Sequence, residues 1–350
     1  MSARRASKYA QVSASVRAMK SRMLGENDYD RLLRCSTSSE CLSILQENDY
    51  FQSTATATEM ADPTSWQKLS DGKMIALVHK LANLSPDDCA RLLTAFEGQR
   101  RLEYLKAGLR LMAAKESKEL QSDALPGEYV DDSLRSAAET RNVERLVQAA
   151  GAPSLQGEIS SALAEKRPLA LVEAIVDRYA FLRTWAAADM PERMDKESVR
   201  GLVGEQIDLT NMLLVARSKV LGVSGEELQQ VLVPVDYHLG GTLSDAVSAG
   251  SVTNALRAFA KTAYGSSIER FLDTVKEGDS LHRLEVSLRR RHANSCLAVF
   301  GGFPFRAGLP LAFAYLTGYE LSDVSSIVFA KRDGFPIERI QQFLVLQKAL

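Results

Sequence analysis

The sequence predicts an all-α protein of three similar helical domains in a funnel-like, pseudo-threefold arrangement. Apolar residues recur at helical spacing along most of the chain, sustained β alternation is absent, and one helical stretch recurs at an offset of 112 positions. Aromatic residues make up only 7%, while Ala and Leu are plentiful, which favours helices over a β-sandwich. The chain has 350 residues, 45% of them apolar, so we expect more than one domain.

The first helix is predicted by an apolar stripe with steps of three and four residues. The stripe consists of Tyr9, Val12, Val16, Met19 and Met23. Gly25 and Asn27 are expected to end this helix, and a short second helix is expected around Leu32 and Leu33.

The following segments also predict helices. Thr37 and Glu40 have the spacing of a capping box that opens a helix ending near residue 50. The polar stretch 52–64 is expected to be a loop, and a helix should cover 74–81. Residues 85–88, Ser-Pro-Asp-Asp, are a strong helix start, because Ser caps, Pro fits the first turn and acids favour the helix N-terminus.

Two segments separate the helical regions. Residues 121–127 and 234–241 carry Pro and Gly, so we expect boundaries there. The run 231–235 is the most strand-like in the chain, and Pro234 weakens it. The predicted domains are residues 1–120, 121–235 and 236–350.

The repeat is clearest when 208–232 is placed on 320–344. The matched pairs include Leu209 with Leu321, Met212 with Val324, Val215 with Ile327, Lys219 with Lys331, and Gly222 with Gly334. In both copies a helix should end at the glycine, which favours a left-handed C-terminal position. A second helix should then begin, capped by Ser224 and Glu227 in one copy and opened by Pro336 in the other.

A weaker match extends the repeat to the N-terminal third. Residues 101–110 align with 208–217 at an offset of 107, and 32–50 align with 246–264 at 214, which is twice 107. Apolar stripes can match by chance, but the matched glycines and lysines are not periodic apolar positions. A period near 107 predicts three small helical domains rather than a solenoid of short repeats such as a tetratricopeptide scaffold.

Charge and cysteine usage limit the possible partners. The chain has 43 basic and 44 acidic residues, so no general field favours nucleic acid, and any partner must be recognised locally. Cys35, Cys41, Cys89 and Cys296 form no CxxC pair and are expected to be reduced thiols of a cytoplasmic protein. We expect no signal peptide at 1–9 and no membrane span, because the best apolar run, 303–316, is short and interrupted.

Catalytic and metal-binding patterns are weak, so neither metal nor cofactor is expected. The pairs at Asp87 and Asp131 could indicate a Mg-dependent prenyl-synthase-like enzyme, but neither has a third Asp four residues after the first. Both pairs favour helix starts instead. The four histidines lack ligand spacing, and the Gly-Gly pairs at 240 and 301 lack the Lys of a phosphate loop.

The only concentrated basic run is Arg289, Arg290, Arg291 and His292. It is either a solvated helix face or a contact for an acidic partner or for lipid headgroups.

Several segments together resemble the C subunit of V/A-type (vacuolar/archaeal-type) rotary ATPases and ATP synthases, whose homologue in the vacuolar enzyme is designated d. The similar segments are Tyr9 with Val16-Arg17-Ala18-Met19 and Met23-Leu24, Tyr29 with Leu32-Leu33, Leu45 with Asp49-Tyr50, Asp208-Leu209 with Asn211-Met212, Arg217 and Lys219, Leu281 with Leu284-Glu285 and Leu288, and Glu320-Leu321 with Asp323-Val324 and Ile327. Their order and spacing over the whole chain carry the resemblance. Tyr104 and Asp323 stand where the central copy has Asn211, which departs from a shared polar role.

The resemblance implies a non-catalytic, funnel-shaped adaptor between the membrane rotor ring and the foot of the central stalk, on the cytoplasmic face of the membrane. Its implied partners are the central-stalk subunits and the ring, and it implies no cofactor. The transported ion that it implies is a proton or sodium.

Eight polar residues are candidate partner contacts. They are Asp208, Asn211, Arg217, Glu320 and Asp323 in the matched helices, and Arg289, Arg290 and Arg291 in the basic run. The alternative is that the matched residues cap or bridge neighbouring helices. A general helical scaffold and the Mg-dependent enzyme stay open as alternative functions.

Overall fold

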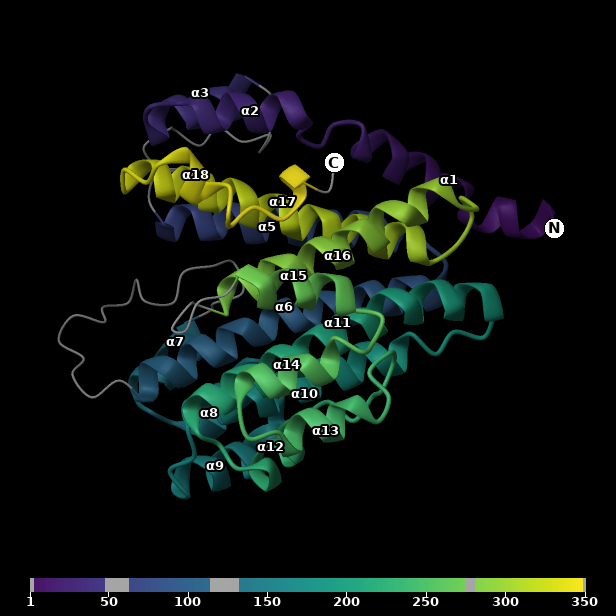
Figure 1. Cartoon of the computed structure of the whole chain (residues 1–350). Coiled ribbons are helices and arrows are strands. Elements are labelled where there is room, and N and C mark those ends of the chain that lie inside the picture. Colours follow the sequence, from purple (N-terminus) through teal and green to yellow (C-terminus); the bar gives the residue numbers. More distant parts are fainter. Residues whose placement is uncertain (1–2, 48–62, 114–131, 275–280, 349–350) are drawn as a thin grey trace.

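The computed structural model describes residues 3–47, 63–113, 132–274 and 281–348 (Figure 1). Every regular element in those ranges is a helix, and none of the described residues lies in a strand, the run 231–235 included. The predicted all-α class is confirmed.

Six long helices form three antiparallel hairpins. The hairpins are α5 (Pro63–Asn83) with α6 (Asp87–Ala113), α10 (Leu169–Ala187) with α11 (Arg193–Leu221), and α16 (His282–Gly301) with α17 (Gly308–Arg332). Helix α6 packs on α10, α11 packs on α16, and α17 packs on α5. The contacts between hairpins therefore close on themselves, and α17 lies beside α5 although the two are far apart in sequence (Figure 1).

Three short helix pairs follow the same cyclic order. The pairs are α2 (Glu26–Arg34) with α3 (Ser38–Glu47), α7 (Asp132–Glu139) with α8 (Val143–Ala149), and α13 (Thr242–Ser248) with α14 (Val252–Phe259). The second pair packs on α6 and the third on α11, each on the long helix that ends the preceding hairpin. The first pair has no preceding hairpin in the chain, and it packs on α17 and α18 at the other end of the sequence.

The remaining helices fill the spaces around this framework. They are α1 (Ala3–Lys20), which packs on α17, and η2 (Pro153–Leu155), α9 (Gln156–Ala164), α12 (Gly225–Val231), α15 (Gly265–Thr274), α18 (Ile337–Ile340) and η3 (Leu346–Lys348).

The N-terminal helices follow the sequence prediction with one correction. Tyr9, Val12 and Val16 of the predicted stripe are buried. The prediction that Asn27 ends the first helix is wrong, because α2 begins at Glu26 and contains it. The Gly25 N–H donates to the Asp28 carboxylate at 2.9 Å, so this segment opens a helix instead of only ending one.

The predicted helix starts at Thr37 and at residues 85–88 are found close to their expected places. The Glu40 N–H donates to the Thr37 hydroxyl at 3.2 Å, while the Glu40 carboxylate accepts from the Ser36 N–H instead of that of Thr37. Helix α6 begins at Asp87, which leaves the proline just outside the first turn. The predicted loop at 52–64 lies largely outside the described residues, and the boundary at 121–127 lies wholly outside them.

The two glycines matched by the repeat end their helices in the same way. Gly222 has φ 69° and Gly334 has φ 73°, in the left-handed region that favours glycine. The Val223 N–H donates to Ser218 O at 3.0 Å, and the Phe335 N–H donates to Ala330 O at 2.8 Å. These closing bonds are themselves 112 positions apart, so the predicted glycine ends are confirmed.

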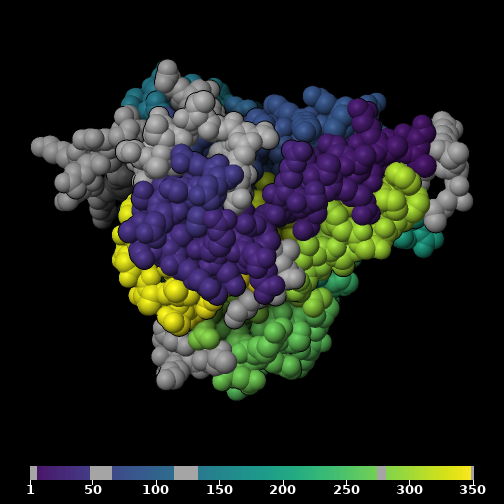
Figure 2. All heavy atoms as spheres, turned by 90° about the horizontal axis from the view of Figure 1, so that it is seen from above, coloured from purple at the N-terminus to yellow at the C-terminus, as the bar shows by residue number. Residues whose placement is uncertain are grey.

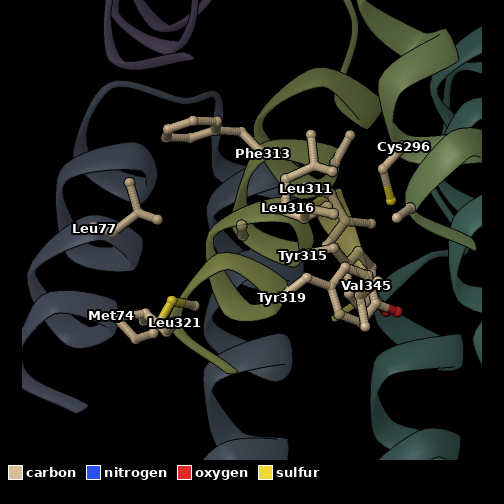
Figure 3. Packing of buried hydrophobic residues seen from close by; sticks show 14 of the residues in the cluster. Met74, Leu77, Cys296, Leu311, Phe313, Tyr315, Leu316, Tyr319, Leu321 and Val345 are labelled. Carbon is tan, nitrogen blue, oxygen red and sulfur yellow. The ribbon is translucent and has the colours of Figure 1, made fainter. Parts of the chain in front are cut away.

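The buried side chains join helices from distant parts of the chain. Figure 3 shows Met74 of α5 facing Leu321 of α17, within a cluster that also contains Cys296 of α16. A second cluster of buried residues joins α6 with α10, α11 and α14. Both clusters cross the predicted boundary between residues 235 and 236, and the division 1–120, 121–235 and 236–350 stays a prediction.

Candidate functional site

Asp208 and Glu320 are paired by the repeat at an offset of 112. Each accepts a hydrogen bond from the segment that precedes the short helix pair packed on its own helix. The Asp208 carboxylate on α11 accepts from the His238 N–H at 2.7 Å, just before α13. The Glu320 carboxylate on α17 accepts from the Leu24 N–H at 2.7 Å, just before α2. Leu24 and His238 are separated by 214 positions, the offset found in the sequence.

Asn211 and Asp323 form a second matched pair of contacts. The Asn211 side chain accepts from the Val233 N–H at 3.0 Å and donates to the carbonyl oxygen of the same residue at 2.9 Å. The Asp323 carboxylate accepts from the Val345 N–H at 2.7 Å. Val233 and Val345 are again 112 positions apart, so both side chains hold the segment that follows their own helix hairpin.

Lys219 and Lys331 form the third matched pair. The Lys331 ammonium donates to Leu33 O at 2.6 Å, at the end of α2, and the Lys219 ammonium donates to Val247 O, at the end of α13. A lysine near a helix C-terminus that bonds an exposed carbonyl satisfies one of the acceptors left there.

These contacts define two junctions. The middle junction joins α11 to the α13–α14 pair through Asp208 and Lys219. The closing junction joins α17 to the α2–α3 pair through Glu320, Asp323 and Lys331. Its hydrogen bonds hold the N-terminal helices against a helix near the C-terminus.

Burial controls the electrostatics of the junction carboxylates. Desolvation raises the pKa of Asp208 to about 6, although hydrogen bonds from Tyr264, His238 and Tyr237 oppose the rise. Desolvation likewise raises the pKa of Asp323 to about 6, against hydrogen bonds from Val345, Leu346 and Tyr29. Since the hydrogen bonds come from fixed backbone and tyrosine donors, both carboxyls serve as acceptors that position segments.

The basic residues divide between a surface cluster and the two junctions. Arg217 and Arg289 both bind Glu285, at 2.7 and 2.6 Å, and both arginines are substantially exposed. The Arg291 guanidinium lies over the Tyr264 ring at 5.0 Å, beside the middle junction.

Arg290 contributes to the closing junction. Its guanidinium donates to Leu344 O at 2.6 and 2.9 Å and to Gln341 O at 3.2 Å. Burial lowers the pKa of Arg290, and the nearby Asp323 opposes that change. Arg290 and Asp323 thus hold the 341–346 segment from its carbonyl and its amide side.

The eight predicted contact residues therefore differ in burial and in the contacts that they make. Asp208, Asn211, Glu320 and Asp323 are at most 2% exposed, and their contacts are internal, as the capping alternative predicts. Arg217 is exposed and lies beside Arg289, which is partly exposed like Arg291, and Arg290 binds internal carbonyls. Whether any of the eight contacts a partner stays a prediction.

The acidic pair at the start of α6 makes local contacts. Asp87 and Asp88 lie in the first turn, and Asp88 forms an ion pair with Arg91. The second pair, at 131–132, begins outside the described residues. Within the described ranges, no three His, Cys, Asp or Glu side chains gather as metal ligands would.

None of the helices in the described ranges has the length and apolar character needed to cross a membrane.

Sequence reasoning missed the tyrosines that complete the two junctions. The Tyr264 hydroxyl donates to Asp208 at 2.8 Å, and the Tyr29 hydroxyl donates to Asp323 at 3.1 Å. The offset of 214 pairs Tyr264 with residue 50 and Tyr29 with residue 243, so it could not have paired the two tyrosines with each other. The offsets of 112 and 214 could have found Val233 with Val345 and Leu24 with His238, had backbone partners been considered.

Comparison with known proteins gives one consistent family. The family described as ATP synthase (C/AC39) subunit matches residues 12–343. The C subunit of the A-type ATP synthase of Methanocaldococcus jannaschii is 22% identical over 345 residues, which cover 96% of this chain and 86% of the relative. The corresponding A-type ATP synthase proteins of Methanobrevibacter smithii and Methanosarcina mazei are 20% and 24% identical, over 96% and 97% of this chain and 88% and 93% of the relatives.

The family match spans nearly the whole chain and includes both junctions apart from residues 344–346. The chain therefore belongs to the ATP synthase (C/AC39) subunit family, as a subunit of a rotary ATP synthase or ATPase.

Proposed function

We propose that this chain is a non-catalytic adaptor in the central stalk of a V/A-type rotary ATPase, where it joins the rotor shaft to the membrane ion-translocating ring. It would act on the cytoplasmic face of the membrane, with stalk subunits and the ring as its partners. Family membership supports a place in the complex, and the cyclic packing of the hairpins supports a mechanical role.

The observation that carries the proposal is the closed cycle of helix contacts. One elementary charge crossing about 100 mV is worth about 2.3 kcal/mol, so several ions per ATP place roughly 10 kcal/mol of load on the joint. An open row of helices would bend at its free ends, whereas the α17–α5 contact and the closing junction leave no free end.

We further infer that the chain consists of three units related by pseudo-threefold symmetry. The matched bonds at the middle and closing junctions support two equivalent interfaces. Equivalent interfaces would distribute torque evenly around the axis, which suits a coupling between a shaft and a ring.

The test is genetic and biochemical. A tagged copy should bring down stalk and ring subunits, and a deletion strain should retain ATP hydrolysis while losing ion pumping driven by it. Reintroducing the chain should restore pumping. Unchanged pumping per ATP in the deletion strain, or a tagged chain that isolates alone, would contradict the proposal.

A further inference from the structure

Two cysteines lie together at the turn between α2 and α3. Cys35 directly follows the last residue of α2, and Cys41 lies in the first turn of α3. The Cys35 thiol donates to Arg31 O at 3.3 Å, and the Cys41 thiol donates to Leu32 O at 3.4 Å. Since these two carbonyls are consecutive in α2, both sulfur atoms lie at the same end of that helix. The two thiols are also within hydrogen-bond reach of each other.

Non-covalent contacts hold this turn in its shape. The Glu40 carboxylate accepts from the Ser36 N–H at 2.7 Å, and the Thr37 hydroxyl accepts from the Glu40 N–H at 3.2 Å. Arg31 and Glu47 form an ion pair at 2.8 Å between the two helices. A disulfide forms readily only between cysteines whose side chains already lie close, because a distorted bridge stores strain. The turn brings the two side chains together while both are still free thiols.

The other two cysteines have different surroundings. Cys89 lies near the start of α6, beside Ser85, and Cys296 lies in α16, beside His292. Both are fully buried. Because their neighbours belong to other parts of the fold, these two thiols are suitable controls for the pair at the α2–α3 turn.

The two thiols of the pair differ in accessibility. Cys35 keeps 7% of its surface exposed, whereas Cys41 keeps none. Figure 2 shows the α2–α3 pair, in blue-purple, at the surface of the molecule beside the yellow C-terminal helices. Burial raises the pKa of Cys41 to about 12, Cys35 acts in the same direction, and the Lys331 ammonium opposes the rise. Since the thiolate is the nucleophile and Cys41 keeps its proton, Cys35 is the thiol that reacts first.

We propose that Cys35 and Cys41 form a dithiol site that small disulfides of the glutathione class oxidise to an intramolecular disulfide. The Cys35 thiolate attacks one sulfur of glutathione disulfide, and the bond between the two glutathione sulfurs breaks. This step leaves a mixed disulfide on Cys35 and releases one glutathione. Cys41 then loses its proton and attacks the Cys35 sulfur, which releases the second glutathione. In total, two electrons and two protons pass from the protein to the oxidant.

The bridge acts on the closing junction. Lys331 of α17 donates to Leu33 O, in the same last turn of α2, and α3 packs on α17. A bond between Cys35 and Cys41 restricts the unfolded conformations of the α2–α3 turn. Oxidation should therefore slow hydrogen exchange in α2–α3 by about tenfold or more, and reduction should reverse the change. This inference does not depend on the proposed coupling role.

The experiment incubates the folded full chain with glutathione and glutathione disulfide at graded ratios, and then alkylates the remaining thiols in urea. Trypsin cleaves after Arg34 and Lys68, so the peptide 35–68 contains both cysteines of the pair and no other. The bridged peptide should carry no alkyl group and weigh two hydrogen atoms less than the reduced peptide. Cys89 and Cys296 should be recovered in alkylated form at every ratio.

Matched variants separate the pair from the other thiols. C41S should form no bridge and should keep glutathione attached to Cys35, because no second thiol displaces it. C89S and C296S each remove a buried thiol elsewhere and should form the bridge like the unaltered chain.

Three outcomes would overturn the proposal. The first is an unaltered chain whose peptide 35–68 is alkylated at both cysteines at every ratio. The second is a bridge that forms only in denatured protein or that includes Cys89 or Cys296. The third, which concerns the closing junction, is equal hydrogen exchange of α2–α3 in the bridged and reduced chains. Co-purification with stalk and ring subunits tests the coupling role separately, because it needs no oxidant.

Discussion

The Tyr29 hydroxyl donates a hydrogen bond to the Asp323 carboxylate across 294 positions of sequence, at 3.1 Å. The same carboxylate accepts from the Val345 and Leu346 N–H groups, each at 2.7 Å. One buried side chain therefore holds the first short helix pair and the C-terminal segment against α17.

Asp323→Ala should destabilise the protein strongly. It leaves three donors, from Tyr29, Val345 and Leu346, without their acceptor, and the expected loss is about 3 kcal/mol or more of unfolding free energy. Urea denaturation measures it. The stability of Asp323→Asn should lie between those of the unaltered chain and the alanine variant, because its amide still offers one oxygen. Glu338→Ala, at an exposed position of α18, should change the stability little. An unaltered midpoint for the alanine variant would contradict this account.

The junction carboxyls should make stability depend on pH in an unusual direction. Asp208 and Asp323 have pKa values of about 6 in the folded protein, above the ordinary value of 3.8. Between about pH 4 and 6 the folded state binds more protons than the unfolded state, so their contribution falls as pH rises through this window. Over this pH window, each carboxyl should lose about 3 kcal/mol of its contribution to the free energy of unfolding.

The measurement compares urea midpoints of the unaltered chain and of D208N/D323N from pH 4 to 7. The unaltered chain should lose stability relative to the double variant as pH rises. Exposed acids with lowered pKa values, such as Glu165 and Glu227, act in the opposite direction in both proteins and cancel in the difference. Parallel pH profiles would show that the two carboxyls titrate normally.

Lys331→Met and Lys219→Met should loosen different parts of the molecule. Each removes a charged donor from a helix-end carbonyl, at a cost of about 2 kcal/mol. Hydrogen exchange should then rise in α2–α3 for the first variant and in α13–α14 for the second. If both variants loosened the same helices, the assignment of the two lysines to separate junctions would be wrong.

Alanine at the two matched glycines should be unfavourable. G222A and G334A each force a side chain into the left-handed region, which costs about 1 kcal/mol or more. The control G98A lies inside α6 with open space around the added methyl group and should stabilise by about 1 kcal/mol. Thermal unfolding gives the sign of each change, and a stabilised G222A or G334A would refute the glycine argument.

The exposed arginines should affect association more than stability. In R217Q the Arg289 partner still neutralises Glu285, and in R289Q Arg217 does so, hence unfolding free energies should change by less than about 1 kcal/mol. If these arginines meet an acidic partner, each variant should join the rest of the complex more slowly and with weaker salt dependence. Unchanged association kinetics in both variants would remove Arg217 and Arg289 from the candidate contacts.

The sequence was sufficient for the all-α class, for several of the helices and for the matched helix ends, while the division into three repeats stays a prediction. Apolar spacing located α1, the start signal at residues 85–88 located α6, and the offset of 112 positions correctly paired Gly222 with Gly334. These features are local, because helix periodicity and a left-handed glycine depend on residues within one or two turns.

The tertiary structure alone decided what the matched polar residues do. Asp208 and Glu320 could have faced solvent or a partner, since a carboxylate on a helix suits either place. Their burial follows from the packing of α13–α14 on α11 and of α2–α3 on α17, contacts between segments far apart in sequence. The spacing of apolar residues indicates which face of a helix is buried. Which neighbour covers that face depends on the packing of the whole chain.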